Sequence, residues 1–366
     1  MFRLMLLSGW TLTHLYVFLR LSSLPWVRRR VSRKALLAAG TLLFATWFMR
    51  GAGASGGTFS HVVDLFTLNW LGLLFLMGSA FLAGDLLTGF GLLFRRWVPM
   101  IRTFSLFAGV ALGGLALWQG TRPPEVTRYE VSLPGLPMEL DGTTVAALSD
   151  THLGDSLGAP WFSDVAERVR TLRPDMIVLL GDISEGRARP DGELIRILRG
   201  LDAPLGVYGV LGNHEFHGEG SRLMEDAGIR VLRDAHREAA PGLVVAGVDD
   251  LGTLRRRGGR PEDAIRKALR GRPAGAVIYL SHTPAFAEAA AAEGAGLMLS
   301  GHTHGGQLWP YGYILRLLNP LFAGRYDVDG MAVLVSRGTG TWGPRMRLWR
   351  PAEIVVITLR APRISS

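Results

Sequence analysis

The sequence predicts a chain in two parts: an N-terminal domain of four transmembrane helices, followed by a layered α/β domain whose central sheets are flanked by helices. Three observations support this fold class. The first third of the 366 residues contains four long apolar runs. After Gly120 the composition becomes polar and proline-bearing, which is typical of a linker. From Thr143 onward, short apolar runs alternate with amphipathic stretches, as they do in α/β proteins.

The four apolar runs cover approximately Leu4–Leu19, Ala35–Phe48, Leu65–Gly84 and Thr103–Gly120. The last two approach the ~20 residues that a helix needs to cross the hydrocarbon core, and the first two are shorter. Because three further runs follow the first, a cleaved signal peptide explains it less well. A hydrophobic content of 48% and a mean hydropathy of +0.22 also favour a membrane protein. We therefore expect residues 1–120 to form the transmembrane domain of an integral membrane protein.

The positive charge of the chain lies in this N-terminal part. The formal net charge is +9, and residues 1–120 carry eleven basic residues against two acidic ones. The remaining 29 basic and 29 acidic residues cancel, so the downstream part has no basic excess to attract phosphate backbones. We therefore expect the lipid bilayer as a partner and no nucleic acid. The absence of cysteine excludes disulfides and thiolate metal sites.

The distribution of basic residues predicts an orientation, because positive loops tend to stay cytoplasmic. Nine basic residues lie between the first and second runs or between the third and fourth, and only Arg3, Arg50 and Arg122 lie on the other side. If all four runs span the membrane, both chain ends and the downstream domain lie outside the cytoplasm. If the second run fails to insert, the basic loops no longer share one side.

Residues 121–140 are expected to form a linker that becomes an edge strand around Tyr129–Leu133, and residues 141–366 the α/β domain. The predicted strands are the apolar runs at Val145–Leu148, Met176–Leu180, Leu205–Leu211, Leu243–Val248, Val277–Leu280, Leu297–Leu299, Met331–Val335 and Ile354–Leu359. The predicted helices are Trp161–Leu172, Glu193–Leu198, Ser221–Ala227, Pro261–Leu269 and Pro284–Ala292.

Polar side chains follow five of these strands directly. They are Asp150 and His152, Asp182, Asn213 and His214, His282, and His302 and His304. Ligands of open α/β sheets gather at the carboxyl ends of the strands. Nitrogen and oxygen donors without sulfur suit divalent Mn, Fe, Zn or Co. Each short motif alone is compatible with an ordinary turn, but all five in this order predict a metal site.

The series Asp150-x-His152, Gly181-Asp182, Gly212-Asn213-His214-Glu215, His282 and Gly301-His302-x-His304 resembles the calcineurin-like metallophosphoesterase family. The resemblance covers roughly residues 140–360. The resemblance is closer to membrane-associated bacterial members. Their GHTHGGQ motif corresponds to Gly301–Gln307, and their RPEI motif corresponds to RPAEI at Arg350–Ile354, with one inserted alanine. Some of these members act as UDP-2,3-diacylglucosamine pyrophosphatases of lipid A synthesis, and the resemblance implies that the protein lies in a bacterial cell membrane.

The resemblance implies two divalent metal ions that share one carboxylate. The first ion would be held by Asp150, His152, Asp182 and His304, and the second by Asp182, Asn213, His282 and His302. If the segment is extended, His302 and His304 point to the same face and each reaches one ion. Gln307 is then expected at the rim of the pocket.

The resemblance also implies a metal-dependent hydrolase of a phosphoester or pyrophosphate, with in-line attack by metal-activated water. His214 is the candidate catalytic residue, either stabilising the transferred group or protonating the leaving oxygen, and its alternative role is to orient a ligand. Asp249 and Asp250 are candidates for supporting the site or for forming a turn, and Trp342 for shaping substrate access. For the whole protein, the sequence leaves open a hydrolase of a lipid-linked substrate, a lipid A pyrophosphatase, and a membrane scaffold or transport protein with a regulatory metal domain.

Overall fold

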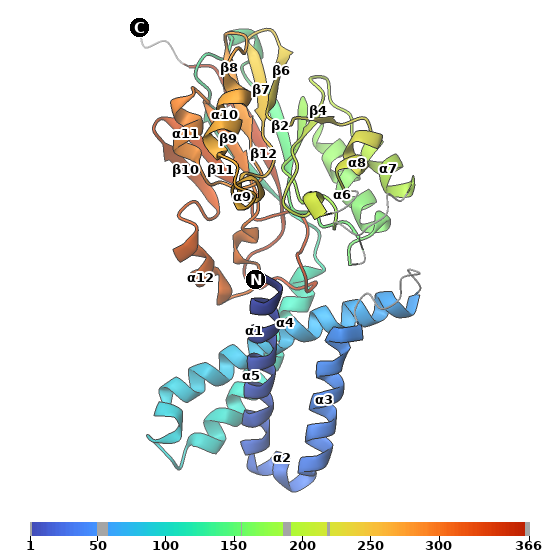
Figure 1. The fold of residues 1–366 in the computed structure, drawn as a ribbon, viewed down its shortest axis with the longest axis vertical. Helices are drawn as coiled ribbons and strands as arrows, with labels where there is room; N and C mark the ends of the chain where they lie inside the picture. Colours follow the sequence, from blue (N-terminus) through green and yellow to red (C-terminus); the bar gives the residue numbers. More distant parts are fainter. Residues whose placement is uncertain (1, 50–57, 155, 186–191, 218–219, 363–366) are drawn as a thin grey trace. The chain divides into compact units, whose positions relative to one another are not determined.

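A computed structural model describes residues 2–49, 58–154, 156–185, 192–217 and 220–362. The chain divides into two compact units (Figure 1). The N-terminal unit comprises Met1–Thr121 with two later segments, Leu308–Pro310 and Gly343–Trp349. The second unit comprises Arg122–Gln307, Tyr311–Trp342 and Arg350–Ser366. Arg50, which enters the predicted orientation, lies outside the described residues.

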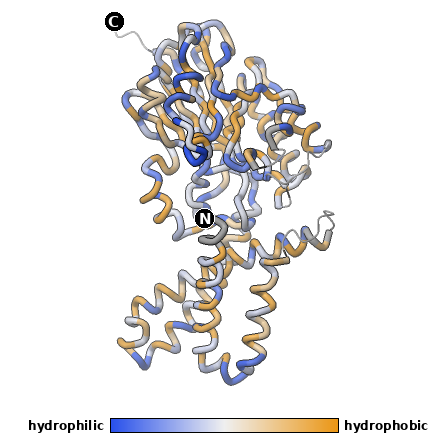
Figure 2. The backbone as a smooth tube through the Cα atoms, in the orientation of Figure 1, coloured by the Kyte–Doolittle hydropathy of each residue, from blue (hydrophilic) through white to orange (hydrophobic). Residues whose placement is uncertain are grey.

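The N-terminal unit is helical, and all four predicted apolar runs lie in helices. The helices are α1 (Phe2–Ser23), α2 (Pro25–Arg30), α3 (Arg33–Met49), α4 (Thr58–Leu87) and α5 (Val98–Gly120), with a 3-10 turn η1 (Gly89–Gly91). Figure 2 shows apolar residues along these helices and hydrophilic ones at the α2 turn. Among the described residues, two helical segments are long and apolar enough to cross a membrane, His61–Leu87 and Val98–Gly120. The prediction of four spanning helices is therefore supported for α4 and α5 only.

Close packing joins α4 to α5. A Cβ atom on Gly109 of α5 would lie only 2.7 Å from the Cα of Met77 on α4. Glycine at this position lets the two helix backbones approach each other, as in other membrane helix pairs. Further along, the fully buried Asp85 of α4 accepts a hydrogen bond from the Tyr16 hydroxyl of α1 at 2.6 Å and one from the Arg102 Nε of α5 at 3.2 Å. This carboxylate links three helices at one end of the unit.

The two later segments of the N-terminal unit pack on α4 and α5. Leu308, Met346 and Leu348 form a buried cluster with Leu76 of α4 and Ala116 of α5. The backbone N–H of Arg347 also donates to the Ala116 carbonyl at 2.9 Å. A buried apolar cluster of this kind stabilises the unit by removing apolar surface from water.

The second unit is built on two six-stranded sheets. The first has the order β1-β12-β2-β3-β4-β5, and the second β10-β11-β9-β8-β7-β6. The strands of the first sheet are β1 (Glu125–Ser132), β12 (Glu353–Arg360), β2 (Thr144–Leu148), β3 (Met176–Leu179), β4 (Val207–Gly209) and β5 (Arg230–Val231). Those of the second are β10 (Gly324–Val328), β11 (Met331–Val335), β9 (Leu297–Ser300), β8 (Ala276–Leu280), β7 (Leu243–Gly247) and β6 (Ala235–Ala240).

The sheets are the two inner layers of a four-layer arrangement. Val145 and Val178 of the first sheet share a buried cluster with Ile278 and Leu299 of the second. A second cluster joins the first sheet to α6 (Ala159–Leu172), α7 (Gly192–Arg199) and α8 (Gly220–Asp226). A third joins the second sheet to α9 (Leu251–Arg256), α10 (Pro261–Leu269) and α11 (Ala287–Ala292). The predicted layered α/β class is confirmed.

The parallel strands place the predicted ligands at one edge. β2, β3 and β4 run parallel in the first sheet, and β7, β8 and β9 run parallel in the second. Strand β1 lies at the edge of its sheet, as predicted. The sequence did not predict β5, β6, β10, α9 or α12 (Tyr311–Leu318). The helix predicted over Pro284–Ala292 begins later, at Ala287, because Phe286 has a φ of +66°.

Candidate metal centre

Six of the seven predicted ligands converge from both sheets into two groups of three. In the first group, Nε2 of His152 lies 3.1 Å from Nε2 of His304. The same nitrogen of His304 lies 3.4 Å from Oδ1 of Asp150. Asp150 and His152 follow β2, and His304 follows β9, so this group joins the carboxyl ends of one strand from each sheet.

In the second group, Nε2 of His282 lies 3.2 Å from Oδ2 of Asp182 and 3.2 Å from Nδ1 of His302. Asp182 Oδ2 also lies 3.9 Å from His152 Nε2, so this carboxylate stands beside both groups. In each group, one ligand atom from each of three side chains lies within 4.8 Å of the others.

The donors fit divalent metal ions. The side-chain oxygen of Asn213 is buried and has no hydrogen-bond partner among the described residues. His282 Nδ1 lies 2.8 Å from the Leu180 carbonyl, which leaves Nε2 directed at the Asp182 carboxylate. Metal-binding histidines are commonly held in this way, with one ring nitrogen on a carbonyl and the other on the metal.

The loops that carry these side chains are strained and closely packed. Asp150, His152, Asp182, His302 and His304 all have positive φ, between +47° and +72°. Residues other than glycine rarely adopt this conformation, and clusters of such strain are found at functional sites. The segment is therefore not extended: His304 begins a 3-10 turn, η4 (His304–Gly306). The expected extended conformation was wrong, although both imidazoles do reach separate groups.

Glycines allow the ligand loops to approach each other. A Cβ atom on Gly301 would collide with the side chains of Ser149 and Asp150. One on Gly212 would collide with the carboxylate of Asp182. Any larger residue at these two positions would push a carboxylate out of its group.

The charges of the site are strongly coupled. Burial favours the neutral acid at Asp182, but His282 and the other histidines hold the pKa of this carboxyl well below its usual value. Burial likewise opposes a charge on His282, yet Asp182 and Asp150 raise the pKa of this imidazole well above its usual value. Positive charge is thus favoured where the two carboxylates meet the histidines, which suits a site for cations.

Glu215 holds two ligand loops together. Its buried carboxylate accepts backbone N–H groups from Asp182 at 2.9 Å, Ile183 at 2.6 Å, Ser184 at 3.1 Å and Gly212 at 2.7 Å. Burial and the charge of Asp182 raise the pKa of Glu215. Sequence analysis assigned no role to this glutamate, although its place in GNHE, directly after Asn213 and His214, was a usable signal.

His214 lies beside both groups and is held by Glu185. Its Nδ1 is 3.1 Å from Glu185 Oε2, and its backbone N–H donates to Asp182 Oδ1 at 2.9 Å. Glu185 Oε1 also lies 2.9 Å from Nδ1 of His152. Burial opposes the charge, but the hydrogen bond to Glu185 and the charge of Asp182 raise the pKa of His214 to about 9. These two contacts favour the protonated imidazole of His214. No motif in the sequence pointed to Glu185.

Trp342 lies beside His214, with 6.3 Å between the two ring centroids. Gln307, which was expected at a pocket rim, is buried behind it. The side chain of Gln307 donates an N–H to the Trp342 carbonyl at 3.0 Å and accepts the Trp342 N–H at 2.9 Å. These bonds hold the Trp342 backbone next to the site.

The structure gives Asp249 and Asp250 other roles. Asp249 pairs with Arg233 at 2.9 Å on the surface. Asp250 caps α9 by accepting the Thr253 N–H at 2.6 Å.

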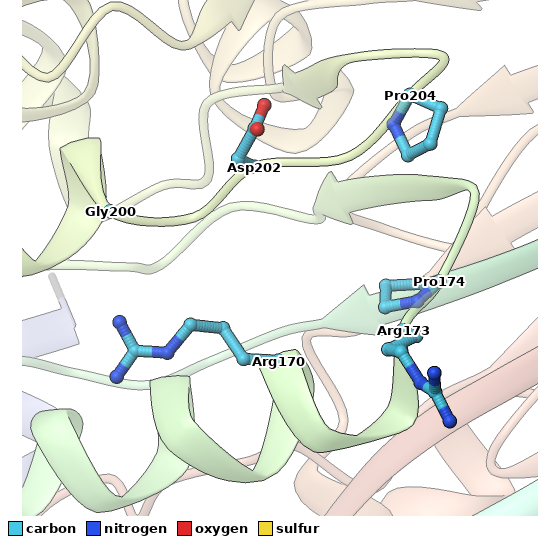
Figure 3. Close-up of a pocket in the computed structure, with 6 residues that line it drawn as sticks. All are labelled: Arg170, Arg173, Pro174, Gly200, Asp202 and Pro204. Atoms are coloured by element: carbon cyan, nitrogen blue, oxygen red, sulfur yellow. The ribbon is translucent and has the colours of Figure 1, made fainter.

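A separate surface hollow of about 370 Å³ lies by the end of α6, lined by Arg170, Arg173, Pro174, Gly200, Asp202 and Pro204 (Figure 3). Its residues precede β3 and β4, so it lies at the opposite edge of the sheet from the histidines.

Comparisons with known proteins agree with this geometry. A family model described as calcineurin-like phosphoesterase matches residues 143–306. A transmembrane protein with metallophosphoesterase domain from Bos taurus is 35% identical over 284 residues, covering 73% of this chain and 64% of that protein. The chain also covers 62% of a protein of the same name from Danio rerio. It therefore spans less than two thirds of either protein.

A shorter relative is matched along nearly its whole length. An uncharacterized metallophosphoesterase of Aquifex aeolicus is 34% identical over 263 residues, covering 70% of this chain and 98% of that protein. Among solved structures, a dimetal phosphatase from Danio rerio is 16% identical with a TM-score of 0.34, covering 54% of this chain and 88% of that one.

Proposed function

The chain belongs to the calcineurin-like metallophosphoesterase family, and we propose that it is a membrane-tethered hydrolase that cleaves a phosphoester or pyrophosphate bond with two divalent cations. The observation that carries this proposal is the place of Asp182. Its Oδ2 lies 3.2 Å from His282 and 3.9 Å from His152, so one carboxylate serves both groups of donors.

We assign the two cations to the two groups. The first would be held by Asp150, His152, Asp182 and His304, and the second by Asp182, Asn213, His282 and His302. When bound, such cations supply positive charge for the phosphoryl oxygens and lower the pKa of a water molecule, so that hydroxide forms near neutral pH. The nitrogen and oxygen donors suit Mn, Fe, Zn or Co.

The proposed acid is His214. Glu185 and Asp182 favour its protonated form, and the ring is partly open to solvent, with 23% of its side chain exposed. Glu185 holds the ring through Nδ1, which leaves Nε2 to donate a proton to the leaving oxygen. General acid catalysis of this kind contributes typically ~10²–10⁴-fold to a rate.

We propose a lipid-linked substrate because a membrane-tethered enzyme meets lipids at the bilayer surface. Helices α4 and α5 are long and apolar enough to span, and two relatives are named as transmembrane proteins. We further propose that all four apolar helices span, and that the metal domain lies outside the cytoplasm, because nine basic residues lie in the two loops on the other side.

The test is hydrolysis by the purified full-length protein with added Mn²⁺. Three substrates separate the alternatives: an aryl phosphate, an aryl phosphodiester and UDP-2,3-diacylglucosamine. We expect turnover of at least one aryl substrate, lost on treatment with a chelator. Turnover of UDP-2,3-diacylglucosamine would favour the lipid A pyrophosphatase. Metal-loaded protein that hydrolyses none of the three would favour the scaffold alternative.

A further inference from the structure

Helix α12 exposes an apolar face that no other described part of its own unit covers. Tyr313, Ile314, Leu317 and Leu318 lie on one side of this helix, and all four are exposed, Leu317 by 86% and Leu318 by 71%. Exposed apolar groups of this size on a rigid helix indicate an interaction surface.

The other side of α12 packs on the histidine loop. Gly312 contacts Gly306 so closely that a Cβ atom on Gly306 would collide with the Gly312 Cα. Gly312 also lies against the ring of Phe322, whose carbonyl accepts a hydrogen bond from Thr303 at 2.6 Å. Thr303 stands between His302 and His304, so the position of α12 is tied to that of two proposed metal ligands.

Short covalent connections join the unit that contains α12 to the N-terminal unit. The three residues before it, Leu308–Pro310, belong to the N-terminal unit, where Leu308 packs with Leu76 of α4 and Ala116 of α5. At the other connection, five peptide units join Gly120 at the end of α5 to Glu125 at the start of β1. A fully extended chain covers about 18 Å over that length.

The composition of α12 fits a membrane surface. Exposed Trp309, Tyr311 and Tyr313 are of the type enriched where bilayer meets water. Leu317 and Leu318 supply apolar surface, and Arg316 is the only charged residue in the helix. Short helices with apolar and aromatic residues on one face and a basic residue beside them bind in the plane of the lipid headgroups.

We propose that α12 lies in the headgroup region of the bilayer and that the adjoining metal centre acts on phosphate headgroups of membrane lipids. The substrate class rests on the function proposed above, whereas the insertion of α12 does not depend on it. A second copy of this chain or a protein partner would cover the same face, and the experiment below separates these occupants from lipid.

Because the chain has no cysteine, single labels can be placed without removing any residue. Leu317→Cys and, as a matched control, Met138→Cys are labelled with an environment-sensitive fluorophore in the full-length protein. Met138 is 67% exposed and lies in the 3-10 turn η2 (Met138–Leu140), away from α12. The protein is reconstituted into phosphatidylcholine–phosphatidylglycerol vesicles with and without bromine-labelled acyl chains.

We expect bromine-labelled lipid to quench the label at position 317 and not the label at 138. Equal quenching at both positions would overturn the proposal. A label at 317 that is shielded from water but not quenched by lipid would also overturn it, in favour of a protein partner. Neither outcome bears on hydrolysis, so insertion is tested separately from the proposed function.

A second measurement tests the substrate class. Wild-type protein, the double variant Leu317→Glu with Leu318→Glu, and Met138→Glu are assayed on an aryl phosphodiester and on vesicles of phosphatidic acid, phosphatidylglycerol or polyprenyl pyrophosphate. We expect turnover of at least one of these lipids. Its ratio to aryl phosphodiester turnover should fall about tenfold or more in the double variant, since two buried leucines are lost from the lipid, and stay unchanged in Met138→Glu.

Wild-type protein that cleaves the aryl phosphodiester but none of the three lipids would overturn the lipid substrate. An unchanged ratio in the double variant would do the same. Protein that cleaves neither kind of substrate, yet shows lipid quenching at position 317, would contradict the proposed hydrolase. The same result would still support insertion of α12 into the headgroup region.

Discussion

The carboxylate of Glu215 accepts the backbone N–H of Asp182 at 2.9 Å, so a buried acid fixes the loop that carries the shared carboxylate. The same group accepts the N–H of Gly212, next to Asn213. A carboxylate that bonds several backbone donors is hard to replace, because each donor left without an acceptor in the interior costs free energy.

We expect Glu215→Ala to destabilise the second unit. Each buried donor left without an acceptor costs about 1–3 kcal/mol, so the loss of an acceptor for four backbone N–H groups should cost at least about 3 kcal/mol. The thermal midpoint should fall by at least ~6 °C in a unit of this size, measured by calorimetry in detergent. Glu288→Gln, at an exposed position, is the control and should leave the midpoint unchanged. A Glu215 variant as stable as wild type would show that the four hydrogen bonds are dispensable.

Asp182→Ala should abolish turnover and metal loading together, because this carboxylate stands beside both groups of donors. Metal content is measured by mass spectrometry after gel filtration, and turnover with an aryl phosphodiester. Asp249→Ala, which removes a surface ion pair, is the control. Two equivalents of metal and a wild-type rate in Asp182→Ala would contradict the shared ligand.

His214→Ala should keep its metal but lose at least ~10²-fold in kcat, as expected for removal of a proton donor. Metal content and kcat are measured on the same preparation, so that a loss of ligands is recognised. If kcat is unchanged, His214 has only a structural role.

The activity should fall on the alkaline side as His214 loses its proton, because its pKa is raised to about 9. Glu185→Gln removes the hydrogen-bonded negative charge that favours the protonated ring. The pKa of His214 then falls, and the alkaline limb of the kcat profile should move toward neutral pH. Glu167→Gln, which alters only an exposed pair with Arg170, should leave the limb in place. A limb that does not move in Glu185→Gln would assign it to another group.

The orientation is tested with fusions after Gly120. Alkaline phosphatase is active only outside the cytoplasm, and green fluorescent protein fluoresces when it folds in the cytoplasm. We expect phosphatase activity without fluorescence, because the basic residues between the runs favour the cytoplasmic side. Fluorescence without phosphatase activity would reverse the orientation and strengthen the lipid A alternative.

The convergence of the candidate ligands could be predicted in part from strand ends. Parallel pairing of β2 with β3 brings Asp150 and Asp182 to one edge of the first sheet. The approach of His282 also requires the second sheet, which contains β8, to pack on the first, and strand ends alone do not predict that packing. The contact between Glu185 and His214 could not be predicted in this way. It depends on a turn in which Asp182 has a φ of +50°, a conformation that residue preferences disfavour.

Helix α12 and strand β6 escaped prediction for different reasons. The apolar run of α12 is short, and a run of eight residues does not distinguish a helix from a strand. Strand β6, with the sequence AHREAA, is polar and lies at a sheet edge, where an apolar pattern is not required. The membership of Gly343–Trp349 in the N-terminal unit depends on packing against α4 and α5, which composition along the chain does not reveal.

The packing of Leu308, Met346 and Leu348 on Leu76 and Ala116 has a consequence for biogenesis. The ribosome releases α4 and α5 long before it reaches residue 308, so part of the surface of these helices is at first uncovered. That surface is closed only when residues 343–349 have been made. Completion of the N-terminal unit is therefore among the last events of synthesis, and a gene fragment that begins after α5 would produce a domain with three unshielded apolar side chains and a tendency to aggregate.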